Sequence, residues 1–214
     1  SLRPSKKEIF DALLENIEQA DLMLRDSKIL EIGCFIADLL HEFKTGFDAE
    51  VVGVEPSGKA GTHAKKYFDL EIENCVFHES KYFGLSQHNK HTFDLIIVDD
   101  VLSWMSRDLI LPSLASIDWL LKDGGSISLR DFCPQFPFAY PNHHQPGKEV
   151  YNYKSAGGHK QFFLLSGKYL TIYDFTRLDS KYQSTTTSRP DSQSWNDVIL
   201  RKLVEPLHPR LSLS

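Results

Sequence analysis

Residues 27–57 read SKILEIGCFIADLLHEFKTGFDAEVVGVEPS and contain two short apolar runs, separated by a glycine turn and a helical pattern. Residues 28–32 are mostly apolar and lie between turn-forming residues, which is typical of a buried strand. Gly33 follows at once, where the chain must turn tightly and bring its backbone close to another group. Residues 51–54 form a second buried strand, which ends at Glu55. This order is the first half of a nucleotide-binding unit, in which an acid about 20 residues past the turn binds a ribose diol.

Composition limits the kind of protein. The chain has 214 residues, of which 41% are hydrophobic, and this favours one domain with a substantial core. A net charge of −5 gives no basic surface for phosphates, so we expect no nucleic-acid partner. The three cysteines are widely spaced without a CxxC pair, which favours reduced thiols. No apolar run reaches the roughly 18 residues of a membrane span, and we see no secretion leader. We therefore expect a cytoplasmic protein; the sequence does not indicate its oligomeric state.

The remaining chain alternates helices with strands. Helical spacing recurs in four further segments, residues 5–24, 58–68, 107–121 and 158–165. Strand-like runs occur in five, residues 75–78, 93–98, 126–129, 169–175 and 196–204. We predict an α/β, Rossmann-like fold with a seven-stranded mixed sheet, helices on both faces and an antiparallel C-terminal hairpin. Residues 1–26 are expected to form an N-terminal helix packed on the core, and residues 27–214 the main domain, with a loop insertion at 132–156.

Four candidate site residues fall where predicted strands end. They are Gly33, Glu55, Asp99 and Asp131. The carboxyl ends of parallel strands meet at one edge of a sheet, and ligands bind there in α/β folds. We therefore expect these residues to line one pocket, and this convergence predicts an enzyme.

The motifs at these positions resemble those of class I S-adenosylmethionine-dependent methyltransferases. In order, they are LEIGC at 30–34, VGVEPS at 52–57, FDLII at 93–97 and LLKDGG at 120–125. The resemblance implies S-adenosylmethionine as cofactor. One departure stands in the first motif, where the family usually has three glycines and this chain has Gly33, Phe35 and Ala37. A Phe there implies an outward-turned side chain or a reshaped loop. The absence of the second and third glycines also argues against a dinucleotide-binding enzyme, which needs these glycines to bring a pyrophosphate onto a helix N-terminus.

The same resemblance assigns cofactor contacts. Glu55 should accept hydrogen bonds from the ribose hydroxyls. Glu31 bonds either to the cofactor's amino group or only to backbone, because a buried charge must be paired. Glu79 and Ser80 either reach the adenine amino group or form an ordinary polar loop. The expected set is Glu31, Gly33, Phe35, Glu55, Pro56, Glu79, Ser80 and Asp99.

The transfer step needs an acceptor held near the methyl carbon and a group that takes up the acceptor's proton. Residues 132–156 have no regular period and include His143 and His144, and such loops tend to be functional. Either histidine is a candidate base, with Asp99 or Asp131 either orienting the imidazole or acting directly as the base. The alternative is that both histidines are solvated loop residues. Asp99, Asp131 and His144 are also candidate ligands for Mg²⁺ or Mn²⁺, which would activate a hydroxyl.

The acceptor is predicted from a looser resemblance. Residues 141–144 (PNHH) and 151–154 (YNYK) resemble small methyltransferases of surface-polysaccharide and glycan synthesis, which implies a sugar hydroxyl on a glycan or nucleotide sugar. The expected substrate-binding residues are Asp100, Trp104, Tyr151, Tyr153 and Lys154; for Trp104 core packing is an alternative. Two other functions stay open. One is N- or C-methylation of another small metabolite, and the other is a non-catalytic relative that binds a partner.

Overall fold

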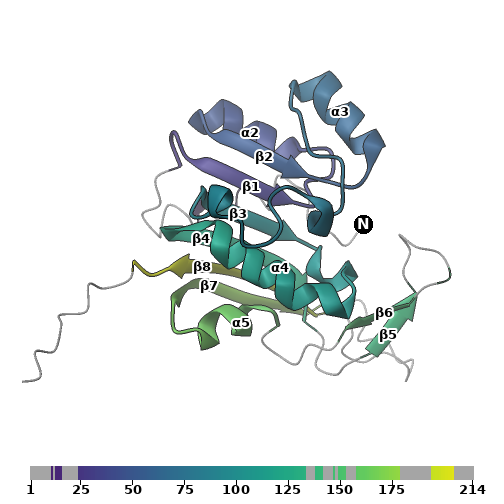
Figure 1. Ribbon diagram of the computed structural model, residues 1–214, viewed down its shortest axis with the longest axis vertical. Coiled ribbons are helices and arrows are strands. Elements are labelled where there is room, and N and C mark those ends of the chain that lie inside the picture. The colour runs from purple at the N-terminus through teal and green to yellow at the C-terminus, as the bar shows by residue number, and fades with distance from the viewer. Residues whose placement is uncertain are drawn as a thin grey trace, which may run out of the picture.

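The computed structural model describes residues 11, 13–15, 24–133, 138–141, 147, 149–152, 158–178 and 194–204. Within these ranges a six-stranded mixed sheet lies between helices (Figure 1). Its strands run in the order β2 (Glu50–Val54), β1 (Lys28–Ile32), β3 (Phe93–Asp99), β4 (Leu121–Phe132), β8 (Ser194–Lys202) and β7 (Tyr169–Leu178). The first four are parallel, and β8 is antiparallel to both of its neighbours. The predicted α/β fold and C-terminal hairpin are confirmed.

Helices cover both faces of the sheet because its central strands are apolar on both sides. On one face α4 (Arg107–Leu120) packs against β4 and the short α5 (Lys160–Leu165) against β7, and Ile117 and Phe163 enter one core with residues of β3 and β4. On the other, α2 (Asp38–Phe47) and α3 (Gly58–Phe68) contribute Phe43 and Ala64. Asp11 and residues 13–15 are helical, and Leu13 is buried in this second core. The rest of the predicted helix over 5–24 lies almost wholly outside the described residues.

The strand predicted at 75–78 is absent, and this explains why the described sheet has six strands rather than seven. Just before these residues, Glu73 forms an isolated β-bridge with Val54. The chain then enters a 3₁₀ turn, η1 (Phe77–Glu79). The Glu73 carboxylate accepts hydrogen bonds from the Ser80 hydroxyl and the Lys81 N–H, both at 3.0 Å. These bonds curl the chain back on itself, so an extended edge strand cannot continue.

The insertion at 132–156 contains regular structure that its sequence did not indicate. β5 (Phe138–Pro141) and β6 (Glu149–Asn152) form a two-stranded antiparallel sheet. β6 contacts the 3₁₀ turn η3 (Leu102–Trp104), beyond the carboxyl end of β3 (Figure 1). The two small strands therefore lie at the edge of the main sheet where the predicted site residues gather.

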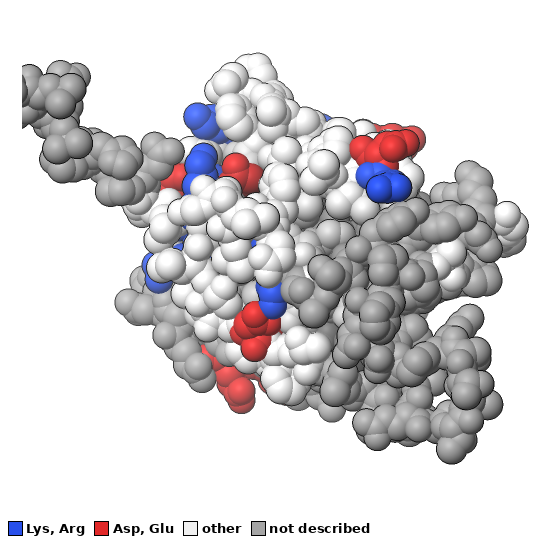
Figure 2. All heavy atoms as spheres, turned by 90° about the horizontal axis from the view of Figure 1, so that it is seen from below, with Lys and Arg blue, Asp and Glu red and all other residues white. Residues whose placement is uncertain are grey.

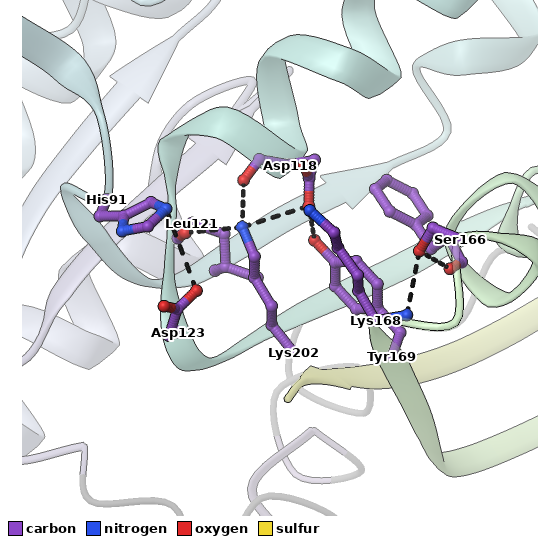
Figure 3. Close-up of polar contacts among 9 residues, drawn as sticks. His91, Asp118, Leu121, Asp123, Ser166, Lys168, Tyr169 and Lys202 are labelled. Carbon is purple, nitrogen blue, oxygen red and sulfur yellow. Dashed lines mark hydrogen bonds and ion pairs between the residues drawn. The ribbon is translucent and has the colours of Figure 1, made fainter. Parts of the chain in front are cut away.

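The opposite edge, where the parallel strands begin, is closed by Asp118, Tyr169 and Lys202, which we call the Lys202 cluster (Figure 3). The Lys202 ammonium donates to the carbonyls of Asp118 at 2.7 Å and Leu121 at 3.2 Å, and so caps the end of α4. The Tyr169 hydroxyl donates to the Asp118 carboxylate at 2.6 Å. Burial and the neighbouring Asp118 charge raise the pKa of Tyr169 above its usual value. This edge is held together by buried polar contacts.

In the part of the chain that the structure describes, no helix is both long and apolar enough to cross a membrane.

Candidate active site

The register of the sheet brings the predicted strand ends into one row. Ile32 pairs with Val54 of β2 and with Val98 of β3, and Val98 pairs with Leu129 of β4. The residues that follow, Glu55, Gly33, Asp99 and Arg130, must therefore lie side by side along the carboxyl edge. Glu55 and Asp99 are two strands apart, which is about 10 Å between backbones. The predicted convergence of Gly33, Glu55 and Asp99 agrees with this geometry.

The loop after β1 keeps the backbone shape of a glycine loop although it has lost two glycines. Gly33 has φ +78°, and a Cβ there would collide with Val101. Phe35 and Ala37 also have left-handed backbones, with φ of +49° and +62°. For such residues this conformation costs about 1–2 kcal/mol each. The Phe35 side chain is 56% exposed, so of the two expected outcomes the structure shows the outward-turned ring.

Glu55 closes this loop. Its carboxylate accepts hydrogen bonds from the Phe35 N–H at 3.1 Å and the Ser57 N–H at 2.9 Å. One oxygen is used for each bond, and each retains a second lone pair. The loop therefore presents a half-exposed carboxylate with acceptor capacity, beside left-handed backbone. These features fit the ribose and methionine parts of S-adenosylmethionine, which contains no phosphate.

The other predicted cofactor contacts differ in burial and in hydrogen-bond partners. Glu31 is fully buried in β1, on the same face as Ile29 and beneath α2. Ser80 is buried with its hydroxyl bonded to Glu73, while Glu79 is exposed. Glu73 therefore shapes this wall, and sequence reasoning missed it because the residues just after it were predicted to be a strand and gave no sign of the turn. Pro56 follows Glu55 directly, in the turn before α3.

Asp99 is engaged by a cation. Its two carboxylate oxygens accept from Arg130 Nε at 2.7 Å and Arg130 Nη2 at 2.5 Å. The side chains are only 8% and 13% exposed, and Arg130 also lies 3.9 Å from Asp197. Arg130 thus balances the charge of Asp99. Sequence reasoning missed Arg130, although its place opposite Asp99 follows from the pairing of β3 with β4.

Asp100 and Trp104 form a second pair beside the row. Asp100 has φ +57°, and its N–H donates to the Arg130 carbonyl at 2.8 Å. Its carboxylate accepts from the Trp104 indole N–H at 3.1 Å. The ring of Trp104 is partly exposed in η3, which contacts β6. The structure therefore brings these two predicted substrate contacts together at the carboxyl edge.

Asp131 lies one residue beyond the row and is 8% exposed. It accepts from the Ser103 N–H at 3.0 Å and also from the Ser103 hydroxyl. The Nδ1 atom of His159 lies 3.5 Å from Oδ2 of Asp131, the oxygen that accepts from the Ser103 N–H. A small pocket opens here, and its lining includes Val98, Leu102, Leu129, Asp131, His159 and Lys160. Sequence reasoning missed His159, for which the only cue was its place after two glycines and before a short helix.

Several predicted residues cannot be placed. His143, His144, Tyr153 and Lys154 lie outside the described residues, and Tyr151 is placed only as a backbone position of β6, opposite Ala139. Across the described ranges, no group of three or more His, Cys, Asp or Glu residues is arranged to hold a metal ion. The predicted metal site of Asp99, Asp131 and His144 includes a residue outside the described ranges and stays a prediction.

The surface is mixed in charge. Figure 2 shows acidic and basic side chains interspersed on the face seen from below Figure 1, with no continuous basic surface among the residues described there. This distribution offers no track for a phosphate backbone on that face.

Comparisons with known proteins support the same interpretation. Residues 24–183 match the model of a family described as a methyltransferase domain. No curated protein matches the sequence significantly. A solved S-adenosylmethionine-dependent methyltransferase from Methanosarcina mazei is 15% identical, with 87% of this chain and 97% of that chain covered and a TM-score of 0.62. One from Archaeoglobus fulgidus is 11% identical, with coverage of 94% and 96% and a TM-score of 0.61.

A third similar structure is 1,6-didemethyltoxoflavin-N1-methyltransferase from Burkholderia thailandensis, solved with its substrate and S-adenosylhomocysteine. It is 14% identical, with 95% of this chain and 92% of that chain covered and a TM-score of 0.59. Because the family model spans more than half of this sequence, the chain belongs to the methyltransferase domain family, which confirms the predicted fold, the predicted enzyme class and S-adenosylmethionine as the methyl donor.

Proposed function

We propose that this chain transfers the methyl group of S-adenosylmethionine to a hydroxyl of a small polar acceptor, with a sugar hydroxyl favoured. The observation that carries the proposal is the loop at Phe35 and Ala37. It retains left-handed backbone without glycine and is tied to Glu55 by a 3.1 Å hydrogen bond. Strained backbone of this kind persists where the surrounding structure and function require the shape.

The cofactor is proposed to lie along the row of strand ends. Glu55 accepts hydrogen bonds from the ribose hydroxyls through its remaining lone pairs. The loop that starts at Gly33 follows the methionine part. The turn formed by Glu73, Glu79 and Ser80 borders the adenine. In this placement the residues at the ends of β3 and β4 would be those that surround the sulfonium.

The acceptor is proposed to bind between η3 and the two small strands β5 and β6. Trp104 offers part of an aromatic face and Asp100 a carboxylate, the two kinds of group that together suit a sugar ring with several hydroxyls. Tyr151, Tyr153 and Lys154 are proposed to complete this pocket. The transfer itself needs an acceptor oxygen in line with the carbon–sulfur bond and a group that takes up the hydroxyl proton.

Cofactor binding can be tested with S-adenosylhomocysteine by isothermal titration calorimetry. We expect binding to the unaltered chain and a Glu55→Ala variant that is weaker by about 2 kcal/mol, roughly 30-fold in Kd. Glu50→Ala is the matched control, because Glu50 is an exposed acid at the other end of the same strand, paired with Lys28. Absence of heat with the unaltered chain, or equal weakening by both variants, would refute the proposed site.

The acceptor class requires a separate assay. Release of S-adenosylhomocysteine is measured with monosaccharides, nucleotide sugars, catechol and heterocyclic amines, and each product is weighed by mass spectrometry. We expect turnover with hydroxyl acceptors, and among these with sugars. Turnover confined to the amines would replace O-methylation by N-methylation while leaving the cofactor site intact.

A further inference from the structure

We propose that His159 is the base that takes the acceptor's hydroxyl proton, and that Asp131 positions its ring. This inference rests on the proposed O-methylation, since a hydroxyl must lose its proton during transfer. Asp131 was already a predicted orienting residue, but His159 was not identified from the sequence, because it follows the insertion and precedes α5 rather than ending a strand.

The first support is the way Asp131 is held. It is 8% exposed at the end of β4, and its two oxygens accept from the backbone N–H and the hydroxyl of Ser103. Ser103 belongs to η3, which also carries Trp104. The carboxylate is therefore fixed both by its own strand and by the turn proposed to bind the acceptor.

The second support is the orientation of His159. Its Nδ1 atom lies 3.5 Å from Asp131, and the two side chains are 9% and 10% exposed. A proton on Nδ1 that faces the carboxylate leaves Nε2 as the lone-pair nitrogen. The distance is long for a hydrogen bond, but catalytic contacts often shorten only when the substrate is bound.

The third support is the pocket. Asp131, His159 and Lys160 are the titratable residues among its described lining, and Val98, Leu102 and Leu129 form apolar walls. The Lys160 ammonium is bound to Asp174 at 2.5 Å, so its charge is balanced away from the ring. Asp99, the other candidate base, has both oxygens bound to Arg130. His159 is therefore the described residue best placed to receive a proton here.

The step balances as follows. The acceptor oxygen attacks the methyl carbon, and a carbon–oxygen bond forms as the carbon–sulfur bond breaks. The bonding pair goes to sulfur, which leaves S-adenosylhomocysteine. The hydroxyl proton passes to Nε2 of His159, and the resulting imidazolium is stabilised by the Asp131 carboxylate until the proton is released to water.

The test compares His159→Asn with His91→Asn. Asn keeps an N–H that can face Asp131 but has no basic nitrogen. His91 lies at the opposite edge of the sheet beside Asp123, at 3.9 Å, and so provides a matched His–Asp pair outside the site. With the acceptor found in the turnover assay, we expect His159→Asn to lower kcat at least about 100-fold and His91→Asn to leave it within about twofold. Both should bind S-adenosylhomocysteine like the unaltered chain.

Two further readouts separate proton transfer from packing. The residual activity of His159→Asn should rise with pH, because hydroxide replaces the missing base, whereas the unaltered enzyme levels off. Asp131→Asn should lower kcat by about 10- to 100-fold with little change in KM. If no acceptor turns over, ¹⁵N NMR of the S-adenosylhomocysteine complex decides the question: in the neutral His159 ring the proton should lie on Nδ1.

The inference is overturned if His159→Asn retains kcat within about threefold, or if the neutral ring carries its proton on Nε2. It is also overturned if a His143→Asn, His144→Asn double variant abolishes turnover while His159→Asn does not. These results leave cofactor binding untouched, so they differ from failure of the proposed function, which appears as absent heat with S-adenosylhomocysteine.

Discussion

Both edges of the sheet contain buried charged residues, but they differ in which residue types have a left-handed backbone. At the amino edge, the left-handed residues other than glycine include Asp26, Asp48, Asp69 and His91, types that tolerate this conformation at turns and helix ends. At the carboxyl edge they include Phe35 and Ala37, which rarely adopt it. The amino edge has helix carbonyls capped by Lys202, whereas the carboxyl edge has a carboxylate tied to a strained loop.

This difference shows which signal marks a functional edge. Buried ion pairs occur at both ends, so burial and charge alone would have identified the Lys202 cluster as readily as Asp99 and Arg130. Unfavourable backbone at non-polar residues occurs at the carboxyl end, together with the pocket beside Asp131. Left-handed backbone at residue types that disfavour it is the better indicator of a ligand site.

The largest expected effect lies at the amino edge. Lys202→Met removes the ammonium of a 5% exposed residue, so two helix-end carbonyls lose its hydrogen bonds. The Asp118 carboxylate keeps its bond from Tyr169 but loses its cation. We expect a loss of about 3 kcal/mol in the free energy of unfolding, measured by urea denaturation. Lys122→Met is the control, because its ion pair with Asp94 is 43% and 36% exposed and should contribute less than about 1 kcal/mol. If the edges differ as argued, S-adenosylhomocysteine should bind folded Lys202→Met unchanged.

The next effect compares the two ends of one strand. Asp99 and Asp94 both belong to β3, but Asp99 is 8% exposed and doubly bonded to Arg130, whereas Asp94 is 36% exposed. Asp99→Asn should reduce the free energy of unfolding by about 2 kcal/mol, because Arg130 loses a charged acceptor in a buried place. Asp94→Asn should cost less than half as much. Equal losses in urea denaturation would show that the Asp99–Arg130 pair has no special structural role.

The sequence predicted the part of the fold that depends on local pattern. Buried strands such as 28–32 and 93–98 are short apolar runs, and the glycine and acid that follow them fixed the site edge. The missing third strand depends on contacts across sequence, since Glu73 accepts from Ser80 and Lys81. The hydrophobic pattern of residues 75–78 gives no indication of those hydrogen bonds.

The candidate site likewise contains residues that the sequence predicted and residues that it did not. Gly33, Glu55 and Asp99 were found because each follows a strand. Arg130 and His159 were missed, because a cation opposite a carboxylate and a histidine before a short helix acquire meaning only from strand pairing and tertiary contact. The outward ring of Phe35 could be stated beforehand only as one of two outcomes.

A smaller expected effect concerns the backbone strain at Phe35. Phe35→Gly removes the Cβ from a backbone with φ +49°, and Phe35→Ala removes the ring but keeps the Cβ. The ring is 56% exposed, so its loss should change burial little in either variant. We expect Phe35→Gly to be more stable than Phe35→Ala by about 1 kcal/mol in urea denaturation, because glycine tolerates the left-handed region. The reverse order would mean that the loop is not strained in solution and would weaken the contrast between the edges.

The smallest effect concerns Asp174 of β7, which binds Lys160 beside the proposed base. Burial raises the pKa of Asp174, but hydrogen bonds from Lys160 and Asn196 outweigh it, so the pKa lies below its usual value. A lowered folded-state pKa contributes stability above the unfolded value of about 4, and this contribution is lost as pH falls below it. Because the carboxylate is 37% exposed, solvent screening reduces the effect to about 0.5 kcal/mol. Between about pH 6 and about pH 3, the unaltered chain should therefore lose slightly more stability than Asp174→Asn, and Lys160→Gln should reduce that excess. An excess that persists in Lys160→Gln would assign the lowered pKa to Asn196 and would separate this ion pair from the carboxyl-edge site.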